Sequence, residues 1–95
     1  MKLYQYFEDH GRMGSIEGLF FLSDEELKLI RGARIYWDEL LGKHSEGVFD
    51  FSEENLTEIV MTKEAAAELF DTLGQVVSGP FDMEYILEEA KEQNG

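Results

Sequence analysis

Cysteine is absent from this 95-residue chain. Without cysteine there is no disulfide framework and no thiolate that could act as a nucleophile or a metal ligand. The absence excludes a small secreted fold held together by disulfides. It is compatible with a reducing environment, and we expect a cytoplasmic protein.

Long hydrophobic runs are also missing. The first ten residues, MKLYQYFEDH, contain no continuous apolar segment, so we expect no signal peptide. The apolar run at residues 19–22 is far shorter than the roughly 20 residues that a membrane-spanning helix needs, and we expect no membrane association. Hydrophobic residues nevertheless make up 43% of the chain, which is enough for a core. We therefore expect residues 1–95 to form a single compact domain.

Positive charge is scarce and unevenly placed. Eight Lys and Arg residues stand against 21 Asp and Glu residues, for a net charge of −13. Residues 48–95 carry twelve acids and only two bases, Lys63 and Lys91. Such a chain repels nucleic acid and anionic membranes, so we expect no direct nucleic-acid binding. A basic protein surface would be attracted to it.

Three consecutive antiparallel strands are predicted within residues 33–62, because apolar and polar residues alternate there with a period of two. The turn-forming segments GKHSEG and SEEN separate the strands. Residues 53–60 also fit the start of a helix, but the β-branched residues Thr57, Ile59 and Val60 favour a strand. Earlier strands are predicted at residues 2–7 and 18–22, with a glycine-containing loop over residues 8–18, and a short edge strand at Val76 and Val77.

Three helices are predicted from their capping residues. Ser23 and Glu26 fit a capping box at the start of the first helix, Thr62 caps a second over residues 63–73, and Asp82 caps a third over residues 83–93. The element order is strand, strand, helix, then three strands, then two helices. We therefore expect an α+β fold, with a small antiparallel sheet of about five strands and the helices packed on one face.

The excess carboxylates are the strongest functional signal. On the third helix, Glu84, Glu88 and Glu92 form a row at i,i+4 spacing, which opposes helix formation by about 0.2–0.5 kcal/mol per like-charge pair. Solubility explains any single carboxylate, but the lopsided distribution favours a surface shaped for a partner. The candidate partner-binding residues are Glu53, Glu54, Glu58, Glu64, Glu68, Asp71, Glu84, Glu88, Glu89 and Glu92, together with Trp37 as an aromatic contact.

Catalytic and metal-binding readings are weaker. The segment Lys43, His44, Ser45 and Glu46 holds residue types found in catalytic groups, but neighbours within one turn seldom face one another. His10 and His44 could in principle share a metal ion, but no metal-binding motif supports such a site. The glycines of residues 11–18 match no phosphate-binding pattern. We expect a protein that is not an enzyme and has no cofactor.

Two hypotheses follow from these observations. The leading hypothesis is a small acidic binding protein that inhibits or regulates a basic, nucleic-acid-binding partner by acting as a nucleic-acid mimic. The alternative is an ordinary interaction module or homodimer that uses an apolar sheet face, with the acidic charge serving solubility. The leading hypothesis requires binding that weakens as salt is added, and the alternative does not.

Overall fold

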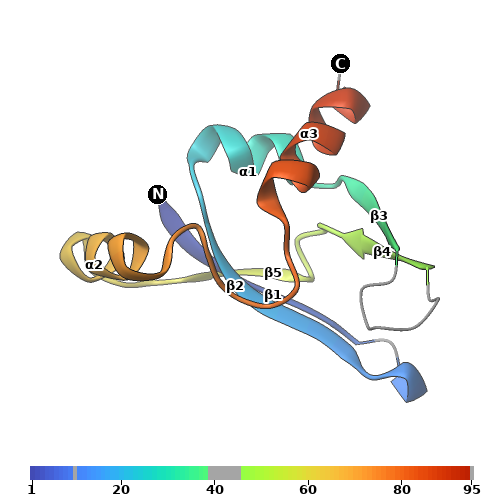
Figure 1. The fold of residues 1–95 in the computed structure, drawn as a ribbon, viewed down its shortest axis with the longest axis horizontal. Helices are drawn as coiled ribbons and strands as arrows, with labels where there is room; N and C mark the ends of the chain where they lie inside the picture. The colour runs from blue at the N-terminus through green and yellow to red at the C-terminus, as the bar shows by residue number, and fades with distance from the viewer. Residues whose placement is uncertain (10, 39–45, 95) are drawn as a thin grey trace.

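A computed structural model describes residues 1–9, 11–38 and 46–94. The chain has the predicted α+β class (Figure 1). Its elements in order are β1 (Lys2–Asp9), the 3-10 turn η1 (Gly11–Met13), β2 (Ser15–Leu22), α1 (Asp24–Ile30), β3 (Arg34–Asp38), β4 (Glu46–Asp50), β5 (Leu56–Ile59), α2 (Lys63–Leu73), β6 (Val76–Ser78) and α3 (Met83–Asn94).

The strands form two sheets rather than one. Strands β5, β1, β2 and β6 make a four-stranded antiparallel sheet in that order, while β3 and β4 pair only with each other. The prediction that residues 33–62 form three consecutive paired strands is therefore wrong in its pairing, although all three strands exist. Strand β5 instead runs along β1, with Leu3 opposite Ile59 and Tyr6 opposite Leu56. Alternation specifies which residues share a face, but it does not specify the neighbouring strand.

The first hairpin is longer than the sequence indicated. Strands β1 and β2 pair over eight residues each, from Lys2 opposite Leu22 to Asp9 opposite Ser15. The loop predicted over residues 8–18 is therefore mostly strand. Only a short turn remains, in which Gly11 and Gly14 adopt positive φ angles of 66° and 95°.

The predicted helix starts are confirmed by their hydrogen bonds. The Glu26 amide donates to the Ser23 hydroxyl (3.1 Å), and the Ser23 amide donates to the Glu26 carboxylate (2.8 Å), which completes the capping box. The Thr62 hydroxyl accepts from the Ala65 amide (3.1 Å) at the start of α2. At the start of α3, the Asp82 carboxylate accepts from an amide of the first turn (3.2 Å). Local sequence therefore decides where each helix begins.

The helices do not all lie on one face of the larger sheet, contrary to the prediction. Figure 1 shows α1 and α3 above the sheet and α2 beyond one end of it. Phe20 and Leu22 face the core below α1 and α3, so the intervening Phe21 faces the opposite side. The ring of Phe70 on α2 packs edge-on against Phe21, with centroids 5.5 Å apart. The apolar stripe of α2 thus covers part of the second face.

Aromatic rings fill the centre of the core between the two sheets. Tyr6 of β1 makes edge contacts with Phe51 (centroids 5.2 Å apart) and Phe81 (5.3 Å), and Phe81 also contacts Phe20 (4.9 Å) and Phe49 (5.0 Å). All five side chains are buried. Aromatic pairs in this geometry contribute about 0.5–1.5 kcal/mol each beyond the area that they bury. The predicted inward residues of the third helix, Met83, Ile86 and Ala90, are buried beside them, and Leu87 is partly buried.

The hydroxyl group of Tyr6 connects the two sheets. It accepts a hydrogen bond from the Asp50 amide on β4 (2.9 Å) and donates one to the Glu8 carboxylate (2.5 Å). Burial, followed by the hydrogen bond to Glu8, raises the pKa of Tyr6 far above the usual tyrosine value. Burial also raises the pKa of Tyr4, on the same strand face.

Side chains bond the outward backbone groups of Arg34 and Asp50, which are paired at one end of the small sheet. On the β3 edge, the Gln93 side chain of α3 accepts from the Arg34 amide (3.3 Å) and donates to the Arg34 carbonyl (2.6 Å). On the β4 edge, the Asn55 side chain donates to the Asp50 carbonyl (2.8 Å). The amide of the same residue donates to the Tyr6 hydroxyl. The two-stranded sheet would be marginal alone, since its backbone groups need these partners.

Phe81 leaves no room for a side chain at Gly18, the residue opposite Tyr6 in β2. A Cβ there would lie 2.4 Å from Cε2 of Phe81 and 2.6 Å from the Ser78 carbonyl oxygen. Gly18→Ala is therefore expected to lower the free energy of unfolding by about 3 kcal/mol, measured by urea denaturation. The control is Gly11→Ala, where a Cβ meets nothing within 4 Å and only the positive φ opposes it, at a cost of about 1 kcal/mol. Equal losses in the two variants would contradict this account.

Removing the Tyr6 hydroxyl should uncouple the sheets. Tyr6→Phe leaves the Asp50 amide without its acceptor and is expected to lower the free energy of unfolding by about 1–3 kcal/mol at neutral pH. Stability should also fall as the pH rises above 10, because the unfolded tyrosine loses its proton near 10.0 while the buried one retains it. For each such tyrosine, the free energy of unfolding should fall by up to about 1.4 kcal/mol per pH unit.

Urea titrations at several pH values check both effects. Tyr6→Phe should remove the part of the stability loss above pH 10 that Tyr6 causes, while the part that Tyr4 causes remains. The control is Tyr4→Phe, whose hydroxyl forms no hydrogen bond with another described residue, so its stability at neutral pH should hardly change. An alkaline slope that is the same in Tyr6→Phe and the unmodified protein would refute the assignment.

Candidate binding surfaces

The predicted partner-binding carboxylates are accessible. Glu89 is half-buried, and the other nine are exposed: Glu53, Glu54, Glu58, Glu64, Glu68, Asp71, Glu84, Glu88 and Glu92. The backbone of Trp37 lies in β3 opposite Gly47, and its side chain is outside the described parts of the structure. The expectation that Trp37 contacts a partner remains a prediction.

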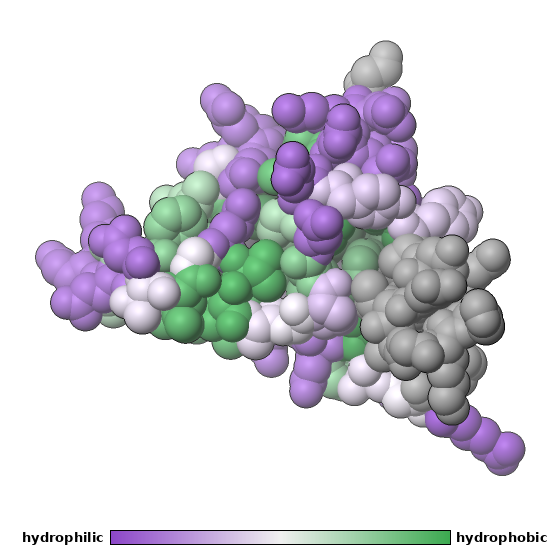
Figure 2. All heavy atoms as spheres, in the orientation of Figure 1, coloured by the Kyte–Doolittle hydropathy of each residue, from purple (hydrophilic) through white to green (hydrophobic). Residues whose placement is uncertain are grey.

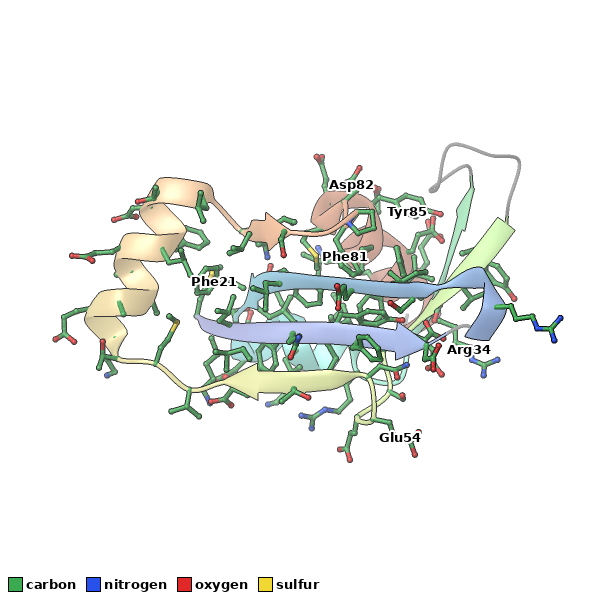
Figure 3. All side chains as sticks on the ribbon, turned by 90° about the horizontal axis from the view of Figure 1, so that it is seen from below. Phe21, Arg34, Glu54, Phe81, Asp82 and Tyr85 are labelled. Carbon is green, nitrogen blue, oxygen red and sulfur yellow. The ribbon has the colours of Figure 1, made fainter. Side chains whose placement is uncertain are left out.

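The carboxylates lie in separate groups and do not form a single cluster. Glu64, Glu68 and Asp71 lie on α2 at one end of the sheet, while Glu84, Glu88 and Glu92 lie on α3 above the core (Figure 1). Figure 3 places Glu54 beyond the β5 edge of the sheet and Asp82 beyond the opposite edge. We call the first set the α2 row and the second the α3 row.

Few of these charges are neutralised within the protein. Among the residues that the structure describes, the single ion pair joins Lys2 and Glu58 at 3.9 Å, and both side chains are about half exposed. An exposed pair at that distance contributes little to stability. Neither row forms an ion pair with a described residue. Both rows therefore remain available to positive charge from outside.

An apolar groove lies between α2 and the face of the large sheet that points away from the core. Its volume is about 730 Å³, within the range of known ligand pockets. Leu3 and Phe21 come from β1 and β2, Ile59 ends β5, and Ala66 and Phe70 come from α2. Two of the three consecutive alanines of α2, Ala66 and Ala67, line the groove, and their small side chains leave its wall low. Nothing in the sequence analysis predicted the groove, because it depends on α2 crossing to the second face of the sheet.

A second apolar area lies near α3. Tyr36 is 71% exposed and Tyr85 is 42% exposed, and the Tyr85 hydroxyl donates to the Tyr36 carbonyl (2.9 Å). Figure 2 shows apolar surface in the middle of one broad face, between the hydrophilic side chains of α2 and those around α3.

The residues considered for catalysis and metal binding lie mostly outside the described parts of the chain. These include His10, Lys43, His44 and Ser45, and only the backbone of Glu46 is described. Within residues 1–9, 11–38 and 46–94, no three His, Asp or Glu side chains are grouped in a way that could hold a metal ion. No helix in these ranges is both long enough and apolar enough to cross a bilayer.

Comparisons with known proteins give no match to a family model, a curated protein or a solved structure. The fold and surface define an acidic α+β domain. Its function has to be argued from its own charges and contacts.

The α3 row allows a test of whether like charges strain the helix. Glu92→Gln is expected to raise the free energy of unfolding by about 0.5–1 kcal/mol at low salt. It removes repulsion from Glu88 and also a negative charge from the last turn, where the helix dipole disfavours one. Glu84→Gln is the matched control, since Glu84 also neighbours Glu88 but lies in the first turn, where its charge is favourable. Urea titrations should show a smaller gain or a loss there, and an equal gain in both would be inconsistent with the dipole effect.

Proposed function

We propose that this protein is a non-enzymatic binding protein that engages a basic surface of a nucleic-acid-binding partner. In its stronger form, the proposal is that the carboxylate rows occupy the place of phosphates and so inhibit the partner. The observation that carries the proposal is the set of exposed carboxylates on α2 and α3 that lack ion-pair partners among the described residues.

Charge density sets how much nucleic acid one row can imitate. Carboxylates four residues apart on a helix are separated by about 6 Å along its axis, so the three of the α3 row span about 12 Å. One strand of duplex DNA places a phosphate about every 3.4 Å along its axis. A row of three carboxylates therefore corresponds in length to about four phosphates and carries slightly less charge. Each helix is suited to a short basic contact and not to a long groove.

The repulsion between carboxylates within α3 also favours a role for them in binding a partner. Like-charge neighbours at i,i+4 destabilise α3, and the described part of that helix offers one base, Lys91, which relieves the repulsion only in part. A partner that supplied Lys or Arg side chains would relieve this repulsion on binding. The alternative role as an apolar interaction module or homodimer is favoured by the groove beside α2, and it differs from the proposal in its response to salt.

A capture experiment followed by matched variants tests the proposal. The immobilised protein is exposed to cell lysate and eluted first with duplex DNA or RNA and then with salt. Release of a basic nucleic-acid-binding protein by the nucleic acid is the expected result. Affinity for that protein should then fall steeply between 0.01 M and 0.15 M salt, as the Debye length shrinks from about 30 Å to about 8 Å.

Two triple variants remove the same number of charges from different helices. One carries Glu64→Gln, Glu68→Gln and Asp71→Asn, and the other carries Glu84→Gln, Glu88→Gln and Glu92→Gln. At least one should weaken the complex by tenfold or more, about 1.4 kcal/mol. Affinity that is unchanged in both variants and indifferent to salt would refute the proposal and favour the apolar module.

A further inference from the structure

The groove beside α2 adjoins an open sheet edge. Strand β5 is the outermost strand of the large sheet, as Figure 3 shows, and the groove is lined by the end of β5 and the residues that follow it into α2. Val60, which continues β5, is 88% exposed. No described strand pairs with the outer edge of β5, so the apolar depression and this open edge form one continuous surface.

The register of β5 shows which backbone groups are open. The Phe7 amide donates to the Asn55 carbonyl (2.9 Å), and hydrogen-bonded residues alternate along an antiparallel pair, so Thr57 and Ile59 also point to β1. The N–H and C=O groups of Leu56 and Glu58 consequently point away from the sheet. An extended peptide could pair with them, as peptides do when they add a strand to a sheet edge.

Side-chain chemistry on the two sides of this edge differs. Ile59 and the groove lie on the outer side, together with Leu3 and Phe21. The Glu58 side chain lies on the other side of the strand, since successive side chains alternate. A strand added here would place every second residue beside the groove and the intervening residues on the side of Glu58 and Leu56.

Charge discriminates between the occupants that could cover the groove. Asp71 of the α2 row lines the groove on the α2 side, and Glu58 borders it at the edge of β5. Lys63 and Lys2 also line it, and Lys2 forms its weak pair with Glu58. The groove lining thus holds charges of both signs, and the whole chain carries a net charge of −13. An acidic peptide, a fatty-acid carboxylate or a second copy of this chain would meet repulsion, whereas a basic segment would be attracted.

We infer that the groove and the open edge of β5 bind an extended segment of the partner in which apolar and basic residues alternate. The apolar side chains enter the groove between α2 and the sheet, and the basic side chains lie beside Glu58. This inference rests on the proposed function and deepens it, because it assigns docking to the α2 side and leaves the α3 row outside the contact.

Three labelled peptides of equal length test the inference by fluorescence anisotropy at low salt: alternating lysine and valine, alternating lysine and serine, and alternating glutamate and valine. The lysine–valine peptide should bind at least about tenfold more tightly than the lysine–serine peptide. The glutamate–valine peptide should not bind. Amide and methyl NMR shifts should move at Glu58, Ile59 and Ala66, and not along the α3 row.

A charge-matched pair of variants identifies the groove. Ala67→Arg places a long side chain in the groove, while Thr72→Arg adds the same charge to the exposed opposite side of α2. Ala67→Arg should weaken lysine–valine binding by about tenfold or more, and Thr72→Arg by about threefold or less. Circular dichroism and urea titration establish that both variants are folded.

The alternative outcomes separate this inference from the proposed function. Salt-sensitive binding of both lysine peptides, unchanged by Ala67→Arg, would overturn the groove assignment and leave the proposed function standing. No binding by any peptide at low salt would overturn both. Equal binding of the glutamate–valine peptide, a fatty acid that displaces the lysine–valine peptide, or a dimer in sedimentation that Ala67→Arg abolishes, would each assign the groove to a different occupant.

Discussion

The hydrogen bonds of the Tyr6 hydroxyl are the interaction on which the rest of this structure depends. Tyr6 stands at the middle of β1, inside the aromatic cluster, and holds the backbone of β4 through Asp50. Without that contact the small sheet would be joined to the large one by apolar packing, which is not directional, and by Asn55, which bonds the Asp50 carbonyl of β4 and the Phe7 amide of β1. A buried hydroxyl needs partners, so it specifies one arrangement of the two sheets among the many that packing would allow.

Helix α3 serves both the core and the surface. Its inward residues fill the core, Gln93 and Tyr85 satisfy the open backbone of β3, and its outward residues form an acidic row. The inward contacts hold the helix in place against the repulsion between its carboxylates, since burying one large apolar side chain stabilises by about 1.5–3 kcal/mol and each like-charge pair costs a few tenths. A strongly charged surface can therefore be displayed without loss of the fold.

Helix α2 differs because it is anchored more lightly. It has no fully buried residue and leaves a groove against the sheet, next to an edge strand whose backbone is open. Natural proteins usually protect such edges, and charge is one way to do so. The acidic surroundings would disfavour pairing between copies of this chain while still admitting a basic strand. Charge and apolar surface would then act together in selecting a partner.

Local patterns in the sequence were enough to predict most of the elements of this protein and its charge. Capping residues such as Ser23, Thr62 and Asp82 predicted the helix starts, and two-residue alternation predicted β3, β4 and β5 but not the full length of the first hairpin, because both signals depend on neighbours along the chain. Only the tertiary structure decided that β5 pairs with β1, that α2 covers the second face beside Phe21, and that the acidic rows lie apart. These features depend on contacts between residues distant in sequence, which no local pattern encodes.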